Sequence, residues 1–371
     1  MKRIFGFIIC LTILTCSAWS EQQPVERSNL YPINIDRNIG YIDKTGTVII
    51  PPQFSKVYPF QEGRAAVKIN QCSQWQYLDE TGQLYPPKFT EVRDFNEARA
   101  AVRINHLWGY INPSIKMVIS PRYEYADSFS EGLAMVGKNG QYGYINKKGK
   151  VVVPLKYTMG IHFSEGLTGV ELNGKWGYID RTGKMVILPQ FDSVWGFSQG
   201  IACVNIGGQK VGGVVTGGKW GYIDTTGKMV IQPQFDWARN FSEGLALVKL
   251  GEKYGYIDRA GKYIVIPQFD NAWDFCNGFA VIYLNQKYGY INQTGKYVVE
   301  PKFDNAYNFS DGLARVNVVI TVGFIDKTGT YVFKPQFERA GDFTDGIAAV
   351  RVAGKWGYID KTGKYIWEPH E

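Results

Sequence analysis

Acidic side chains recur at one position along the chain, directly after a Gly-Tyr-Ile or related triplet. Paired carboxylates can catalyse glycoside hydrolysis, and clustered carboxylates can bind calcium. Other copies of the same position hold Asn, which can neither transfer a proton nor carry a charge. Either side chain can accept hydrogen bonds from the backbone of a turn, so we interpret the position as a turn cap. The acids are Asp43, Asp79, Asp180, Asp224, Asp258, Asp326 and Asp360, and the amides are Asn112, Asn146 and Asn292.

A second row of acids precedes a turn glycine and has the same kind of interruption. Gln199 and Asn277 replace the acid in two copies, which again favours a structural role over acid–base catalysis. The acids of this row are Glu62, Glu97, Glu131, Glu165, Glu243, Asp311 and Asp345.

Histidines and phosphate-binding motifs give no better candidates. His106, His162 and His370 stand at three different repeat positions, so they predict neither a catalytic triad nor a set of metal ligands. The segment "GVVTGGKW" (213–220) has the spacing of a phosphate-binding loop, but Trp220 stands where Ser or Thr would bind magnesium. We therefore predict no catalytic residue, no metal ligand and no cofactor site.

The repetition that places these residues extends over nearly the whole chain. The segment "KWGYIDRTGKMVILPQFD" (175–192) returns as "KWGYIDTTGKMVIQPQFD" (219–236). Most neighbouring copies are 34 residues apart, as Gly143 and Gly177 are. Ten copies align, and Gln76 replaces the glycine in one of them. The aligned glycines are Gly40, Gly109, Gly143, Gly177, Gly221, Gly255, Gly289, Gly323 and Gly357.

Each copy reads as a set of short strands. "GLALVKL" (244–250) and "KYGYID" (253–258) are β-prone and separated by a short turn, so they predict a hairpin. A further strand, "KYIVIP" (262–267), ends at a proline, which cannot donate to a ladder. The remaining "QFDNAWDFCNG" (268–278) is expected to be an irregular link. Aromatic residues make up 15% of the chain, which also favours strands.

A unit of this size cannot bury enough apolar surface alone, so neighbouring units must share a core. We expect an all-β chain of ten repeats, each of about three strands, stacked in an open, twisted, solenoid-like array. Closure into a β-propeller is the alternative, which we rank second because neither terminal copy supplies half of a unit that the other lacks. The predicted array covers residues 30–371 and carries an insertion at 207–218, expected to be a lengthened hairpin turn.

The motifs "KWGYID" and "PQFD" followed by "FSEGLA" resemble the bacterial WG repeat family, also called KWG repeats. The resemblance covers about residues 30–371. It implies a β-rich interaction module that is often secreted or exposed at the cell surface and has no generally assigned enzymatic activity. The departures are Gln76, Val322, Phe324, a shifted proline in "VPLKY" (153–157) and the insertion.

The N-terminus predicts export. Residues 1–20 have Lys2 and Arg3 before an apolar run and then small residues, which is typical of a secretory signal cleaved after Ser20. Acylation at Cys16 is the alternative, which Thr15 disfavours. Residues 21–29 read as a short linker, and no later segment is apolar enough to span a membrane. The formal charge of +7 is not clustered, so nucleic acid is not an expected partner.

Contact residues are sought where the copies differ. The fourth position after the aromatic of "PQF" varies widely, which is unusual for a core position, and it holds several aromatic residues and arginine. In a stacked array these residues would form a line that contacts a protein partner or a cell-surface polysaccharide. Scattered aromatics in links are the alternative. The candidate contacts at this position are Tyr58, Trp195, Arg239, Trp273 and Tyr307, and Trp237 is added because it lies near Arg239 in the sequence.

Overall fold

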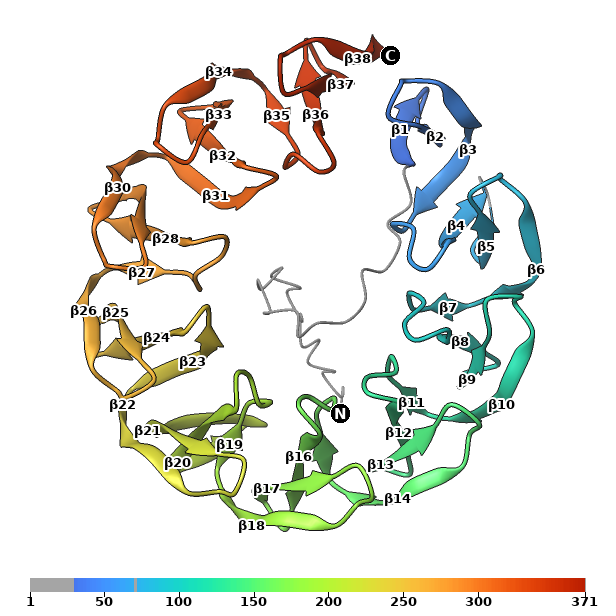
Figure 1. Ribbon diagram of the computed structural model, residues 1–371. Helices are drawn as coiled ribbons and strands as arrows, with labels where there is room; N and C mark the ends of the chain where they lie inside the picture. The colour runs from blue at the N-terminus through green and yellow to red at the C-terminus, as the bar shows by residue number, and fades with distance from the viewer. Residues whose placement is uncertain (1–29, 70–71, 371) are drawn as a thin grey trace, which may run out of the picture.

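The computed structural model describes residues 30–69 and 72–370, and all regular elements within them are β-strands. These strands form nine antiparallel sheets, eight of four strands and one of six. In each sheet the strand order follows the chain order, so every sheet is a meander. The sheets stand side by side around a central opening (Figure 1). A ring of radially arranged meanders is a β-propeller.

This architecture corrects three expectations. The open solenoid is wrong, because the ring closes between the first and last sheets. Ten separate units are not supported either, since the first two motif copies share the six-stranded sheet β1–β6. The link between units is also more regular than expected, because it contains one more strand, so that the repeated sheets have four strands rather than three.

The strands fall into four classes by their place in the sheet. The innermost strands are β7 (Glu91–Val92), β11 (Tyr125–Ala126), β15 (Met159–Gly160), β19 (Ser193–Val194), β23 (Trp237–Ser242), β27 (Asn271–Ala272), β31 (Asn305–Ser310) and β35 (Arg339–Ala340). The second strands are β1 (Tyr31–Ile35), β4 (Arg64–Ile69), β8 (Ala100–Ile104), β12 (Leu133–Lys138), β16 (Leu167–Leu172), β20 (Ile201–Val211), β24 (Leu245–Leu250), β28 (Phe279–Leu284), β32 (Leu313–Val318) and β36 (Ile347–Val352).

The third strands carry the Gly-Tyr-Ile motif: β2 (Asn38–Ile42), β5 (Trp75–Asp79), β9 (Leu107–Ile111), β13 (Gln141–Asn146), β17 (Lys175–Asp180), β21 (Val214–Asp224), β25 (Lys253–Asp258), β29 (Lys287–Asn292), β33 (Thr321–Ile325) and β37 (Lys355–Asp360). The outermost strands are β3 (Val48–Val57), β6 (Leu84–Phe89), β10 (Met117–Tyr123), β14 (Val151–Tyr157), β18 (Met185–Phe191), β22 (Met229–Phe235), β26 (Tyr263–Phe269), β30 (Tyr297–Phe303), β34 (Tyr331–Phe337) and β38 (Tyr365–His370). The end of β3 also pairs with β4, which joins the first two copies into one sheet.

The repeated glycine is explained by an irregularity in the outermost strand. Between β25 and β26 the register shifts, because Tyr254 pairs with Phe269 whereas Tyr256 pairs with Val265. The extra residues bring the β26 backbone over Gly255, where a Cβ would lie 2.5 Å from the Val265 carbonyl oxygen. Only glycine fits so close a backbone approach. The outermost strand therefore continues past its proline to Phe269, beyond the end predicted for it.

The core lies between neighbouring sheets. At one junction, Trp108, Tyr110 and Ile119 of one sheet pack against Ala126 and Phe129 of the next. Tyr110 and Phe129 meet edge to face with ring centroids 5.0 Å apart. Because each sheet contributes to two such clusters, no sheet can bury its apolar side chains without both neighbours.

The ring closes where β1 packs against β37. Tyr31 lies on Tyr358 with ring centroids 6.0 Å apart, and both belong to a cluster with Ile33, Ile42 and Ile347. The Tyr358 hydroxyl donates to the Pro32 carbonyl oxygen at 2.7 Å. We call this junction the seam. The contacts across it show that the two ends of the described chain meet.

Candidate functional site

The first row of acids caps turns, as the Asp/Asn alternation indicated. In the Asp180 turn, one carboxylate oxygen accepts the Thr182 N–H at 2.8 Å, the Thr182 hydroxyl at 2.6 Å and the Lys184 N–H at 3.0 Å. The hydroxyl bond lowers the pKa of Asp180, with the backbone bonds adding to the effect. Asn146 accepts the same two backbone bonds in its own turn. These positions are therefore structural.

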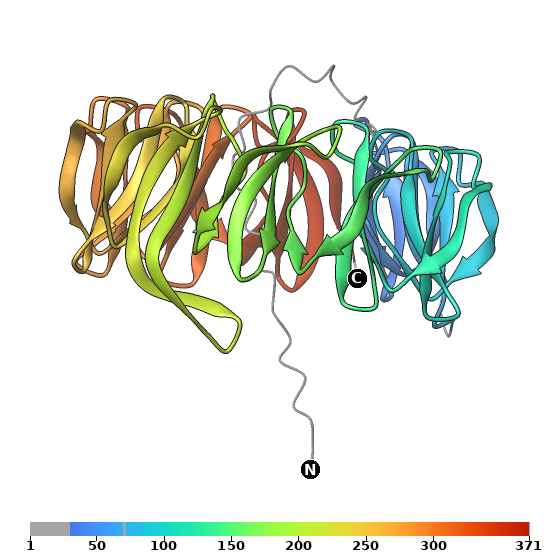
Figure 2. The same cartoon turned by 90° about the horizontal axis from the view of Figure 1, so that it is seen from below.

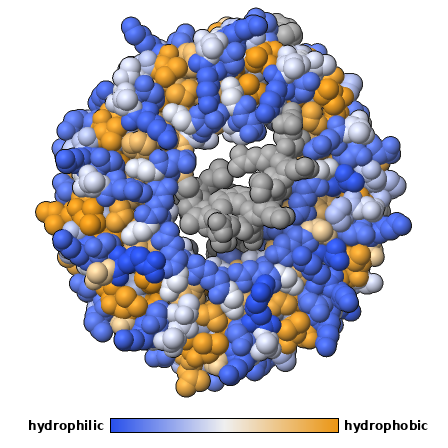
Figure 3. Space-filling view, in the orientation of Figure 1, coloured by the Kyte–Doolittle hydropathy of each residue, from blue (hydrophilic) through white to orange (hydrophobic). Residues whose placement is uncertain are grey.

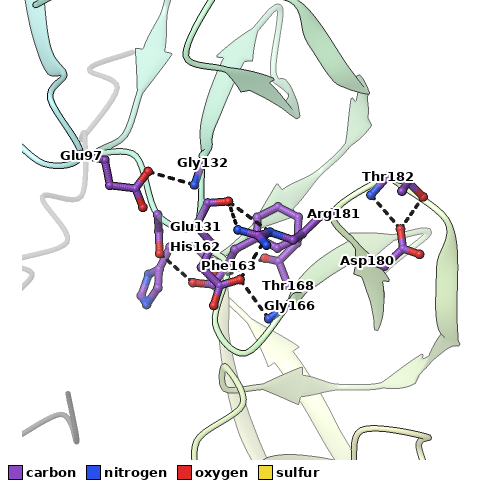
Figure 4. Close-up of polar contacts among 11 residues, drawn as sticks. Glu97, Glu131, Gly132, His162, Phe163, Gly166, Thr168, Asp180, Arg181 and Thr182 are labelled. Carbon is purple, nitrogen blue, oxygen red and sulfur yellow. Dashed lines mark hydrogen bonds and ion pairs between the residues drawn. The ribbon is translucent and has the colours of Figure 1, made fainter. Parts of the chain in front are cut away.

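The second row of acids links neighbouring sheets. Glu97 accepts the Gly132 N–H of the next sheet at 2.9 Å, and Glu131 accepts the Gly166 N–H at 2.9 Å, as Figure 4 shows. Arg181 also contacts the Glu131 carboxylate. These acids make structural hydrogen bonds, and their partner is the turn of the next sheet rather than their own turn. A chain of such bonds joins the turns on one face of the ring.

The tyrosine of the Gly-Tyr-Ile motif makes a further bond between sheets. Its hydroxyl donates to the backbone carbonyl of the variable position in the next sheet. The pairs are Tyr77 to Arg93, Tyr110 to Asp127, Tyr144 to Ile161, Tyr178 to Trp195, Tyr222 to Arg239, Tyr256 to Trp273 and Tyr290 to Tyr307. The backbone of the variable position is thus fixed by the ring, whereas its side chain is free to differ between copies.

All candidate contacts except Tyr58 lie on or directly beside the innermost strands, which surround the opening of the ring (Figure 1). Tyr58 follows the end of β3, which pairs with β4 where the other sheets have an innermost strand. In the space-filling view the described side chains leave an opening at the centre of the ring (Figure 3). Closure therefore places these positions along an arc beside the central opening, in place of the straight line expected for an open array.

Two of the candidates expose much of their side chains. Trp195, next to β19, is 44% exposed, and Tyr58, beside the end of β3, is 40% exposed. Tyr58 also stacks on Trp75 of its own sheet, with ring centroids 4.6 Å apart and the planes 9° from parallel. Trp195 is therefore the most accessible of the predicted tryptophans.

The other candidates form one band across consecutive sheets. Arg239 lies over the Trp237 ring and donates to Asp274 of the next sheet at 2.8 Å. Trp273, which precedes Asp274, packs against Tyr288 with ring centroids 5.6 Å apart. These residues are half-buried. Burial raises the pKa of Asp274, and Arg239 opposes this increase.

The band continues to the next sheet through a residue that the sequence did not single out. The guanidinium of Arg315, on β32, lies 3.6 Å from the centroid of the Tyr307 ring and donates to Asp342 at 2.9 Å. We define the inner-wall band as Trp195, Trp237, Arg239, Trp273, Tyr307 and Arg315. Tyr58 belongs to a different part of the ring. Arg315 was missed because its repeat position, on the second strand, holds apolar residues in most copies.

The motif tryptophans differ in exposure more than a common core role predicts. Trp108 is buried, Trp176 and Trp220 are half-buried, and Trp356 at the seam is 36% exposed. The exposure of the tryptophan at this repeat position therefore differs from sheet to sheet, because the neighbouring sheet differs.

The insertion is a lengthened hairpin, as predicted. It extends β20 and β21, which pair without a break from Gly208 with Gly217 to Val211 with Val214. The hairpin projects from one face of the ring (Figure 2). Lys210 pairs with the buried carboxylate of Glu171 in the preceding sheet at 2.8 Å, which ties the projection to its neighbour.

No group of three or more His, Cys, Asp or Glu side chains in the described part of the chain could hold a metal ion. Within residues 30–69 and 72–370, no helix has the length and hydropathy needed to cross a membrane.

The fold and the repeated motifs together define a β-propeller made of short sequence repeats. The WG containing repeat matches nine segments, namely 39–71, 77–107, 108–142, 142–176, 176–209, 220–254, 254–288, 288–318 and 323–356. The chain therefore belongs to the family of proteins built from WG repeats.

One of three similar solved structures supports the fold, with a TM-score above 0.5. A crystal structure of the eukaryotic initiation factor is 12% identical, with a TM-score of 0.54, and the match covers 93% of this chain and 98% of that one. The dihydro-heme d1 dehydrogenase NirN in complex with DHE is 10% identical, with a TM-score of 0.38 over 73% of this chain and 72% of that one. Apo AztD from Citrobacter koseri is 11% identical, with a TM-score of 0.36 over 91% and 92%. No curated protein matches the chain in sequence.

Proposed function

We propose that this protein is a non-enzymatic binding scaffold that holds a partner against the inner wall of its ring. The observation that carries the proposal is a division of roles within the repeat. The side chains that recur in the copies make turn and inter-sheet bonds, whereas the variable position presents aromatic and arginine side chains near the channel. A site confined to the variable positions fits binding better than chemistry.

The acids give little support to an enzyme. Turn caps such as Asp180 and inter-sheet links such as Glu131 already accept hydrogen bonds from the backbone. A glycoside hydrolase, which is the third and least favoured reading, would need two carboxylates facing one substrate. Hydrolysis that a single Asp or Glu substitution abolished, without loss of stability, would establish that reading instead.

A protein partner or a cell-surface polysaccharide suits the inner-wall band. Aromatic and arginine side chains dominate the energetics of protein interfaces, and exposed aromatic rings also stack on sugar rings. Several such residues on a ring would add up to a multivalent contact. We favour a protein or other ligand docking along the band, with glycan or peptidoglycan binding as the alternative.

A triple variant of Trp195, Trp273 and Tyr307, each changed to Ala, tests this proposal. Binding to a glycan array and to isolated cell-wall material is compared between the wild type and the variant. The matched control is Tyr297→Ala, which removes a 37% exposed aromatic from the outermost strand β30. Glycan binding that only the triple variant loses supports the polysaccharide reading.

If the wild type binds no glycan, a protein partner becomes the working assignment. That partner can be sought by crosslinking on whole cells. Specific capture should be lost in the triple variant and kept in the Tyr297→Ala control. Capture that is equal for both variants would remove the inner-wall band from the proposal.

We place this scaffold in the cell envelope or outside the cell. The support is the sequence of residues 1–20, which lie outside the described residues. Export followed by N-terminal sequencing should give Glu21 as the first residue. A product that is blocked and lipid-modified at Cys16 would show a lipoprotein instead.

A further inference from the structure

The seam contains an apolar cleft of about 310 Å³ between the first and last sheets. One wall comes from β1, β2 and the end of β3, and the other from β36, β37 and β38. Two tryptophans stand in the second wall, and Trp356 is 36% exposed. The lining residues are Pro32, Ile33, Asn34, Ile39, Val57, Ala349, Trp356, Tyr358 and Trp367. This volume is at the small end of the range for ligand pockets.

The same space is filled at a regular junction. Ala126 of the innermost strand β11 is fully buried there, in a cluster that includes Ala101, Trp108, Tyr110, Ile119 and Val136. The strand registers place five seam residues in the same slots, which are Ala349, Trp356, Tyr358, Trp367 and Ile33. All five line the cleft. The cleft is thus the space that an innermost strand and its small apolar side chain take up elsewhere in the ring.

Among the described residues, β1 has a partner on one side only, because it begins the six-stranded sheet. In the regular sheet, Met135 and Gly137 of β12 accept the N–H groups of Asp127 and Glu124 from the innermost-strand side, both at 2.9 Å. Pro32 and Asn34 occupy those two places in β1.

The two places at the open edge are not equivalent. The Pro32 carbonyl already accepts the Tyr358 hydroxyl, and proline has no N–H to offer. Asn34 remains, and it corresponds by register to Gly137, whose carbonyl faces the innermost strand. Because the N–H and C=O groups of one residue in an antiparallel strand point to the same side, both backbone groups of Asn34 face the open edge. One residue of an added strand can pair there. Most innermost strands are nearly as short, with only two residues each.

Residues 21–29, which precede β1, have a sequence that does not match the innermost strands of the other sheets. In register with the other copies, Gln23 stands where they have Ala or Val, and Pro24 stands where they donate an N–H. Glu26 stands where they have the phenylalanine anchor, a place that Tyr31 takes over at the seam by packing on Tyr358. Neither the side chains nor the donor pattern of residues 21–29 suits the cleft.

We propose that the seam cleft binds an extended segment of a partner polypeptide, which pairs with Asn34 at the open edge of β1 and buries a small aliphatic side chain between Trp356, Trp367 and Ile33. This is strand addition combined with a side-chain pocket. The site is separate from the inner-wall band and does not depend on the function proposed for that band.

The repeat itself supplies the probe. A labelled peptide of residues 302–311 contains the innermost-strand sequence around Ala306, which is buried in its own sheet. Its binding to the mature chain, residues 21–371, is followed by fluorescence anisotropy. The control peptide carries Ala306→Lys, because a charged side chain cannot be buried in an apolar cleft.

Two protein variants locate the binding. Asn34→Pro removes the N–H at the open edge, where the side chain is exposed, and Trp356→Ala removes one wall of the cleft. The matched control is Trp176→Ala, which changes the same slot at a regular junction, where the innermost-strand residue Val194 is already present. We expect the two seam variants to weaken peptide binding about tenfold or more, and the control to leave it unchanged. Circular dichroism and urea unfolding show that each variant is folded.

Three results would overturn the proposal. Equal affinity for the wild type and both seam variants would place the peptide elsewhere. Binding that appears only after residues 21–29 are deleted would show that this segment, and not a partner, occupies the cleft. Absence of binding by both the intact and the shortened chain would show that the cleft accepts no strand.

Discussion

The seam and a regular junction use the same residue slots for different tasks. At the regular junction, Tyr110 donates to the Asp127 carbonyl of an innermost strand, and Phe129 packs against its ring. At the seam, Tyr358 donates to Pro32 of a second strand, and Tyr31 takes the place of the phenylalanine. Among the described residues, the ring therefore closes without an innermost strand in its first sheet, and the volume that such a strand takes up elsewhere corresponds to the seam cleft. The repeated contacts between sheets stabilise the ring, and the junction that departs from them contains the seam cleft.

The largest difference between the junctions should come from their aromatic anchors. Phe129→Ala leaves a cavity among fully buried side chains and should lower the free energy of unfolding by about 3–5 kcal/mol. Tyr31→Ala should cost less, about 2 kcal/mol, because the cleft already leaves its surroundings less densely packed. Urea unfolding of both variants measures the difference. Equal losses would show that the seam is packed as tightly as the other junctions.

The ion pair between Arg239 and Asp274 crosses a regular junction within the inner-wall band, so it measures what an electrostatic contact adds to such a junction. Arg239→Ala leaves a buried carboxylate without its partner and should cost about 2–3 kcal/mol, below the value for a fully buried pair because the side chain is 20% exposed. The double variant Arg239→Ala with Asp274→Asn should recover part of this loss. A double variant no more stable than the single one would mean that packing, rather than charge, is what Arg239 supplies.

The pH dependence of the Arg239 variant has a definite sign. Burial raises the pKa of Asp274 above its ordinary value of 3.8, so the folded state binds the proton more readily than the unfolded state. The destabilisation from this group is therefore present at neutral pH and disappears as the pH falls through the folded pKa. Removing Arg239 raises the pKa further, and the cost of Arg239→Ala should shrink in mildly acidic buffer. A cost that does not change with pH would contradict this account.

The tyrosine hydroxyls should show a smaller contrast. Tyr256→Phe removes the hydroxyl of a fully buried side chain, leaves the Trp273 carbonyl without its 2.6 Å hydrogen bond and should cost about 1–2 kcal/mol. Tyr358→Phe should cost about 1 kcal/mol or less, because water in the cleft can reach the Pro32 carbonyl. Phe324 shows that one junction forms without the hydroxyl. Urea unfolding again provides the measurement, and a larger loss at Tyr358 would make its hydroxyl essential for closure.

The smallest effect is expected at a turn that every junction shares. Asp180→Asn should be nearly neutral, because Asn146 makes the same backbone contacts, whereas Asp180→Ala should cause a small loss of stability. Hydrogen bonding lowers the pKa of Asp180 below its unfolded value. Its contribution is thus present above the unfolded pKa and is lost as the pH falls through the folded pKa. Thermal unfolding in acid should show this loss for the wild type but not for Asp180→Asn.

Much of the local structure could be predicted from the sequence. The alternation of Tyr254 and Tyr256 with Gly255 and Ile257 predicted a strand, and the Asp/Asn exchange predicted turn caps. Both depend on residues close together in the chain. The short innermost strand around Asn271–Ala272 was missed because so brief a strand leaves no periodic pattern.

Closure could not be predicted in the same way. It depends on the angle between neighbouring sheets, which packing contacts such as those of Tyr110 and Phe129 set in three dimensions. The expected line of contacts, including Trp195, Trp273 and Tyr307, rested on the open array, and closure turns that line into an arc beside the central opening. Arg315 was not singled out because its contact with Tyr307 comes from another strand of the same sheet.

The seam also determines how the ring should respond to force. Within the described chain, the junction where its two ends meet is held by side-chain packing and by side-chain hydrogen bonds from Tyr358 to Pro32 and from Tyr31 to Asp345. The strands inside each sheet are held by ladders of backbone bonds. A pull on the two ends loads the seam first, because no strand pair crosses it. The seam should therefore separate in a single step at low force. The sheets should remain folded at that point and unfold only at higher force. A protein tethered at both ends would then act as a force-sensitive clasp.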